Sequence, residues 1–120
     1  MRGILILAHG SKRQETNRIL DSLVEKVKKK TGEKLVYPTY LQFSNPDFEE
    51  GIQYLVNNGA KEIRVIPLFL FDGVHVTKDI PEELERIKDN FKDIDIKMAG
   101  HIGDDDRIAD IVVDKVESLN

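Results

Sequence analysis

Four short apolar runs, rich in branched side chains, alternate with amphipathic segments along this chain of 120 residues. The runs cover residues 3–8, 34–41, 62–70 and 94–99. The first and third are almost uninterrupted, which is typical of strands buried on both faces of a parallel sheet. Each run precedes a segment with helical spacing, so the order is βαβαβαβα. This order predicts an α/β fold: an open parallel four-stranded sheet with helices on both faces.

Capping signals indicate where the helices begin and end. The first helix is expected over residues 14–30, ending before Gly32. Its apolar spacing predicts five inward-facing side chains: Ile19, Leu20, Leu23, Val24 and Val27. Asn45-Pro46-Asp47 predicts the start of the second helix, with a cap and a first-turn proline. The third helix is expected from about residue 79 to 90. The fourth should run from the acidic residues 104–106 almost to the C-terminus, with those acids as its cap.

Length and composition limit the size of any binding site. The chain fits one domain spanning residues 1–120. A hydrophobic fraction of 40% and a charged fraction of 33% are ordinary for a globular protein, so disordered and fibrous classes are excluded. A core of this size leaves little room for an enclosed cavity. A large ligand is therefore expected in an open cleft or between two subunits.

Charge and residue usage exclude several classes of partner. The net charge of −4 argues against a nucleic-acid partner, because such proteins carry a basic surface. Cysteine is absent, so a bound metal ion must be held by imidazole, carboxylate or backbone oxygen. The apolar run at residues 4–8 is too short for a signal peptide or a membrane span. We therefore expect a cytoplasmic protein with no membrane partner.

All three histidines follow predicted strands, where parallel α/β sheets bind their ligands. His9 comes after the first strand and precedes a glycine that allows a tight turn. A histidine packed beneath this loop is the structural alternative. His101 follows the fourth strand and fits a loop before a helix cap, so we expect its replacement to be mild. His75 follows the third strand.

The segment at residues 69–77 is the most informative. Aromatic and aliphatic side chains leave the strand, the chain turns at Asp72-Gly73, and His75 precedes the next helix. Apolar side chains at a strand end suit a flat apolar ligand, and imidazole suits a divalent transition metal. A well-packed loop with a histidine near a helix start remains the alternative.

Other α/β families fail on particular residues. The phosphohistidine phosphatases require arginine before His-Gly, and this chain has Ala8. A receiver domain could use Asp72 but lacks the acidic pair after the first strand. Residues 11–14 are a poor flavodoxin phosphate loop, and the glycine-rich dinucleotide motif is absent.

The sequence resembles the small archaeal sirohydrochlorin cobaltochelatases and nickelochelatases, the short form of the class II tetrapyrrole chelatases. The resemblance rests on five segments that span most of the chain: residues 7–11, 43–46, 65–70, 73–81 and 102–108. The Gly-x-His-x-Thr-x-Asp-Ile-Pro run within residues 73–81 is the specific element, whereas His-Gly-Ser alone is weak.

The resemblance implies a chelatase-like fold and a lyase that inserts Co²⁺ or Ni²⁺ into sirohydrochlorin, with release of two protons, in cobalamin or nickel-tetrapyrrole biosynthesis. The metal is a substrate, and no cofactor is permanently bound. The resemblance further implies a homodimer in which His9 is proton acceptor and metal ligand and His75 is the second metal ligand. Substrate contacts are implied at Asn45, Leu70, Phe71, Asp72, Gly73, Val74 and His75. Relatives often have glutamate at position 45. A non-catalytic metal or tetrapyrrole carrier is the alternative function.

Overall fold

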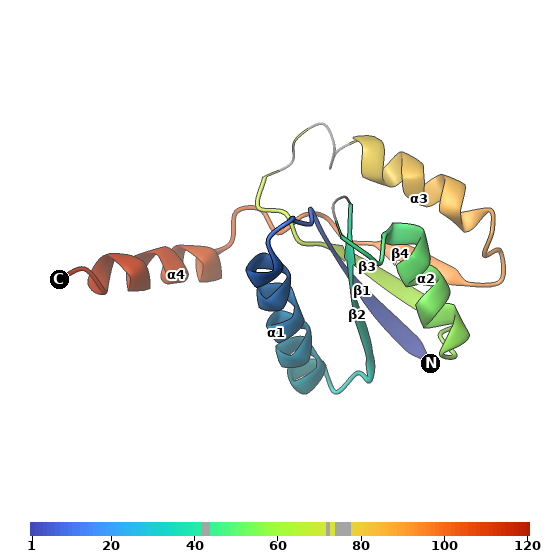
Figure 1. The fold of residues 1–120 in the computed structure, drawn as a ribbon, viewed down its shortest axis with the longest axis horizontal. Coiled ribbons are helices and arrows are strands. Elements are labelled where there is room, and N and C mark those ends of the chain that lie inside the picture. The colour runs from blue at the N-terminus through green and yellow to red at the C-terminus, as the bar shows by residue number, and fades with distance from the viewer. Residues whose placement is uncertain (42–43, 72, 74–77) are drawn as a thin grey trace.

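The computed structural model describes residues 1–41, 44–71, 73 and 78–120. Four parallel strands form a sheet with the order β2-β1-β3-β4 (Figure 1). The elements are β1 (Arg2–Ala8), α1 (Gln14–Thr31), β2 (Leu35–Tyr40), α2 (Phe48–Asn57), β3 (Glu62–Pro67), α3 (Ile80–Lys88), β4 (Asp95–Met98) and α4 (Asp106–Glu117). This arrangement confirms the α/β fold expected from the sequence.

Helix α1 covers one face of the sheet. Leu20 and Val24 are buried against Ile4 and Ile6 of β1 and Val36 of β2. The helix ends at Gly32, whose φ of 75° places it in the left-handed region and whose N–H donates to the Lys28 carbonyl. The C-terminal stop expected at this glycine is therefore confirmed.

One inward residue of α1 was predicted wrongly. Ile19 is 71% exposed. Consecutive helical residues differ by about 100° around the axis. Ile19 therefore lies well to the side of the stripe centred on Leu20 and Val24. The apolar face is narrower than the composition of the helix suggests.

Helices α2 and α3 cover the opposite face (Figure 1). Alternate residues of the strands point to this side, because side chains in a strand alternate between faces. The main core contains Leu5, Leu7, Ile63, Val65 and Ile96 from the sheet, and Phe48, Ile52, Leu55, Ile80, Leu84 and Ile87 from the two helices. The sheet is thus packed on both sides along β1, which fixes the position of the loop that follows this strand.

The start of α2 is fixed by a capping box. Asp47 accepts a hydrogen bond from the Glu50 N–H at 2.9 Å, and Glu50 accepts one from the Asp47 N–H at 2.9 Å. Pro46 precedes this cap, so the expectation of a first-turn proline is wrong. The reciprocal bonds place the cap at Asp47 and leave Asn45 in the preceding loop.

Strand β3 is shorter than predicted, because the apolar run continues to residue 70 while β3 ends at Pro67. Proline has no N–H to donate, and Pro67 is the last β3 residue paired with β1. Leu68 still donates from its N–H to the Leu7 carbonyl at 2.8 Å. The apolar side chains that follow therefore lie beyond the end of the sheet.

Helix α4 extends away from the sheet as an arm that ends at the C-terminus (Figure 1). Every residue from Ala109 to Asn120 is exposed. The acidic residues at its start act as the predicted cap, because Asp105 accepts a hydrogen bond from the Arg107 N–H at 2.9 Å. Among the described parts of the chain, no helix combines the length and the apolar character needed to cross a bilayer.

Candidate functional site

The sheet order places a topological switch at the carboxyl ends of β1 and β3. Both strands run in the same direction, and their successor helices, α1 and α3, pack on opposite faces. The loops that follow them therefore separate and leave a crevice, which is where ligands bind in open α/β sheets. His9 and the segment after β3 both lie at this edge.

His9 is exposed directly after β1. Its imidazole meets the ring of Phe69 edge-on, with centroids 4.4 Å apart and planes inclined by 81°. Phe69 is 4% exposed, so a buried ring supports one side of an accessible one. Gly10 follows with a φ of 90°, which lets the chain turn sharply. The alternative of a histidine packed beneath its loop is not what the structure shows.

The apolar side chains after β3 are presented to solvent. Leu70 is 44% exposed and Phe71 is 80% exposed, whereas Phe69 between them and the sheet is buried. Large apolar side chains that remain exposed together commonly mark a binding surface. The predicted apolar rim is therefore present at Leu70 and Phe71, adjacent to the aromatic ring that supports His9.

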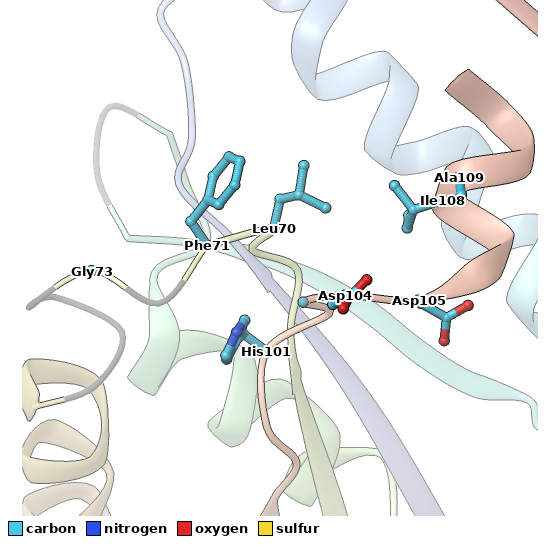
Figure 2. Close-up of a pocket in the computed structure, with 9 residues that line it drawn as sticks. Leu70, Phe71, Gly73, His101, Asp104, Asp105, Ile108 and Ala109 are labelled. Carbon is cyan, nitrogen blue, oxygen red and sulfur yellow. The ribbon is translucent and has the colours of Figure 1, made fainter. Parts of the chain in front are cut away.

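A pocket of about 640 Å³ opens beside this rim (Figure 2). One wall consists of Leu70, Phe71 and Gly73. The other comes from the β4–α4 loop and the first turn of α4: His101, Gly103, Asp104, Asp105, Ile108 and Ala109. Its volume lies within the range of about 300–1,000 Å³ that is usual for small-molecule sites. The pocket is thus apolar on one side and mixed on the other.

The second wall was missed by the sequence reasoning, which treated His101 as an ordinary loop residue. β4 pairs in parallel with β3, so the segments beyond both strands emerge side by side. The Ile102 N–H donates to the Phe69 carbonyl at 2.9 Å and brings His101 next to the apolar rim. The sequence predicts that β4 follows β3 along the chain. Only the strand order of the folded sheet shows that these two strands are neighbours.

The two aspartates of this wall do not form a prepared metal site. Arg107 donates to both carboxylate oxygens of Asp105, at 2.8 and 2.7 Å. These hydrogen bonds hold the pKa of the Asp105 carboxyl well below its usual range. Within the described residues, no group of three or more histidine, aspartate or glutamate side chains lies close enough to hold a metal ion.

Several predicted site residues fall beyond what is described. Asp72, Val74 and His75 lie outside the described residues, so their places in the site stay predictions. Asn45 is exposed in the loop between β2 and α2. That loop is joined to the one after β1 by the Ser44 hydroxyl, which donates to the Ser11 carbonyl at 3.0 Å.

The model of the CbiX family matches residues 3–119. The chain belongs to the CbiX family. Its relatives in this family include the sirohydrochlorin cobaltochelatase of Methanocaldococcus jannaschii, 31% identical over 96% of this chain and 97% of that protein. The chloroplastic sirohydrochlorin ferrochelatase of Arabidopsis thaliana is 33% identical over 96% of this chain. The family expected from the sequence is confirmed.

A solved CbiX-like structure has the same fold. The sirohydrochlorin chelatase SirB of Bacillus subtilis subspecies spizizenii, in complex with cobalt, superposes with a TM-score of 0.91 at 27% identity over 98% of this chain. The chain spans about half of that protein, 50%, and about half of the Arabidopsis relative, 51%. The chain therefore matches proteins of two lengths, some about as long as itself and some about twice as long. The chelatase function expected from the sequence agrees with their names.

Proposed function

We propose that this chain is a sirohydrochlorin chelatase, a lyase that inserts Co²⁺ into the tetrapyrrole and releases two protons. The observation that carries the proposal is the exposed His9 imidazole at the switch point, supported edge-on by Phe69, the residue that precedes the exposed apolar pair Leu70 and Phe71. A flat macrocycle can lie on the apolar side chains while its centre meets a proton acceptor. The names of the full-length archaeal relatives support the same activity.

In this mechanism His9 first binds the metal ion and then, once the ion has moved to the ring nitrogens, accepts one pyrrole proton, while the second proton passes to water. Insertion requires two pyrrole N–H protons to leave while the hydrated ion loses water and enters the ring. A neutral imidazole has one unprotonated ring nitrogen, whose lone pair can bind a metal ion or accept a proton. We propose His75 as the second metal ligand.

The tetrapyrrole would contact the apolar rim and its neighbours. We propose substrate contacts at Asn45, Leu70, Phe71, Asp72, Gly73, Val74 and His75. An apolar side chain lowers its exposure when a macrocycle covers it, which favours binding by about 25 cal/mol for each Å² removed from water. Leu70 and Phe71 are the large apolar side chains with exposed surface among the described members of this set.

The metal can be cobalt or nickel, because imidazole ligands suit both ions. Cobalt is favoured by the names of the archaeal relatives and by the cobalt-bound SirB structure.

We further propose that one domain, residues 1–120, carries the activity in the cytoplasm.

We propose that the active form is a homodimer. The face of α4 that carries Ile108, Ile111, Val112 and Val116 is apolar, and Leu119 follows just after the helix; four of these five side chains are at least half exposed. The opposite face carries Asp110, Asp114 and Glu117. An exposed apolar stripe on a helix commonly marks a surface that contacts another protein. The SirB chain that this fold matches is about twice as long as this one. Two copies of this chain would together have about the length of one SirB chain.

An insertion assay tests the proposal. Purified protein is mixed with sirohydrochlorin and, separately, with Co²⁺, Ni²⁺ and Fe²⁺, and the absorbance change of the tetrapyrrole is followed. We expect cobalt or nickel insertion well above the spontaneous rate. Binding of sirohydrochlorin without any acceleration would instead identify a carrier.

A further inference from the structure

Three residues from separate parts of the chain join the loop that carries His9 to the loop that carries Asn45. Asn17, in the second turn of α1, donates from Nδ2 to the Ser44 hydroxyl at 2.9 Å. The Ser44 hydroxyl donates to the Ser11 carbonyl at 3.0 Å. Ser11 is two residues after His9, and Ser44 immediately precedes Asn45. The hydrogen-bonded chain therefore ends beside each proposed site residue.

These two loops need such a connection because the sheet stops before they begin. The Leu41 N–H donates to the Ala8 carbonyl at 3.0 Å, just beyond the last paired residues of β1 and β2. After this point one loop leads to α1 on one face and the other to α2 on the opposite face. The Tyr40 N–H donates to the Pro46 carbonyl at 3.0 Å and ties the Asn45 loop to β2, but this bond does not join it to the His9 loop.

The hydroxyl of Ser44 can serve both neighbours at once. It has one proton, which it gives to the Ser11 carbonyl, and a lone pair that accepts from Asn17. The Ser11 side chain is turned back on its own loop, where its Oγ accepts from the Arg13 N–H at 3.0 Å. The Ser11 carbonyl accepts from the Ser44 hydroxyl and, at 3.5 Å, from Asn17 Nδ2. Donors and acceptors run in one direction, an arrangement in which each bond strengthens the next.

Burial gives this chain of hydrogen bonds its stiffness. Asn17 and Ser44 are both half-buried. The Asn17 Oδ1 atom is buried and has no hydrogen-bond partner among the described residues. The orientation of the amide is therefore set by its NH₂ group, which faces Ser44 and, at 3.5 Å, the Ser11 carbonyl. A buried amide oxygen without a partner costs free energy, which the hydrogen bonds of the Asn17 NH₂ group offset.

We propose that Asn17 and Ser44 are positioning residues that fix the His9 loop relative to the Asn45 loop. The inference rests on the proposed chelatase function. Phe69 supports the His9 ring from the β3 side, and the Asn17–Ser44–Ser11 chain holds the same loop from the β2 side. His9 is thereby restrained on both sides while its imidazole stays open to the crevice. Neither positioning residue contacts the substrate.

The first test separates kcat from KM. Asn17→Ala and Ser44→Ala should each lower kcat for cobalt insertion by about 10- to 100-fold, because a displacement of about 1 Å is costly to a reaction that depends on alignment. The KM for sirohydrochlorin should change by less than about threefold, since the apolar rim is untouched. Ser44→Thr keeps the hydroxyl and should recover most of the rate. A fall in rate matched by an equal rise in KM would overturn the proposal.

Asn57→Ala is the matched control. It also removes an amide, one whose Oδ1 accepts from Gln53 Nε2 at 2.8 Å, but on the exposed surface of α2. Its kinetics should equal those of the wild type. The double variant Asn17→Ala/Ser44→Ala should be about as slow as the slower single variant, because the two residues act through one chain. Losses that multiply would show that they act separately.

A measurement on the protein alone distinguishes this inference from the chelatase proposal. In histidine-labelled protein, nuclear magnetic resonance reports the His9 and His101 rings, assigned with His9→Gln and His101→Gln. Ser44→Ala should shift and broaden the His9 signal and leave the His101 signal unchanged. An unchanged His9 signal would overturn the positioning role even in an active enzyme. A wild-type protein without insertion activity would instead remove the chelatase function, whatever the ring signals show.

Discussion

His9 combines two properties that oppose each other in most side chains: it is accessible, and contacts on either side of its loop restrict where it can be. The buried Phe69 ring meets it from one side, and the Ser44 hydroxyl holds its loop from the other. A restrained imidazole loses less conformational freedom when a ligand binds than one on a free loop does. A single exposed histidine can therefore serve as a defined binding and proton-accepting group.

His101 should affect binding more than chemistry. It lines the pocket wall opposite Leu70 and Phe71, away from the aromatic contact that supports His9. We expect His101→Ala to raise the KM for sirohydrochlorin by about three- to tenfold, because one polar contact is worth about 1 kcal/mol, while kcat changes less than twofold. Steady-state kinetics over a range of tetrapyrrole concentrations measure both constants. A large loss of kcat at saturating substrate would place His101 in the chemistry instead.

At the scale of elements, α2 is held to β2 by a close approach that glycine makes possible. A Cβ added at Gly51 would lie 2.0 Å from Thr39 Cγ2, and Thr39 is fully buried. The space between helix and strand is therefore already filled by the threonine methyl group. This packing fixes the helix that follows the Asn45 loop.

Gly51→Ala consequently sets two effects against each other. Alanine favours a helix interior over glycine by about 1 kcal/mol. Overpacking against Thr39 should cost about 1–3 kcal/mol or more, so we expect a net loss of stability. Urea unfolding followed by circular dichroism measures it, with Gln53→Ala in the same helix as a control. A stabilised Gly51→Ala protein would mean that the helix moves away from the strand without cost.

Much of this element structure could be predicted from the sequence, and the errors have local causes. The alternation of strands and helices, the Gly32 stop and the acidic cap of α4 follow from periodicity and capping. The end of β3 at Pro67 does not, because it depends on where β1 ceases to pair. Ile19 was predicted to face inward from the apolar spacing of the helix, but it lies to the side of the buried stripe and is exposed. The pocket wall that contains His101 could be predicted only with the strand order, which places β4 next to β3.

For the molecule as a whole, α4 is the feature that the sequence could not place. Its amphipathic spacing predicts a helix, but the surface that its apolar face contacts depends on a partner. The arm leaves the sheet with Ile111, Val112 and Val116 each more than half exposed. Because the first turn of α4 also lines the pocket, the position of this helix would affect both assembly and substrate binding in the proposed dimer.

The dimer proposal gives a direct prediction for this face. Val112→Asp/Val116→Asp should convert the dimer to a monomer while preserving helical content, because a carboxylate in an apolar interface is strongly unfavourable. The control Asp110→Lys alters charge on the opposite face of α4 and should remain dimeric. Size-exclusion chromatography with light scattering gives the masses. A wild-type protein that is monomeric and fully active would rule out the homodimer as the active form.

We propose that His9 acts on the metal ion and on the pyrrole protons at the switch point. The measurement is the initial rate of cobalt insertion at saturating sirohydrochlorin for the wild type, His9→Ala and His75→Ala, with circular dichroism to confirm folding. His9 is exposed, so its removal leaves the core filled. We expect both variants to lose at least about 100-fold in rate, of the order seen when a general acid or base is removed, while still binding the tetrapyrrole. A folded His9→Ala protein that inserts cobalt at a near-normal rate would contradict the account.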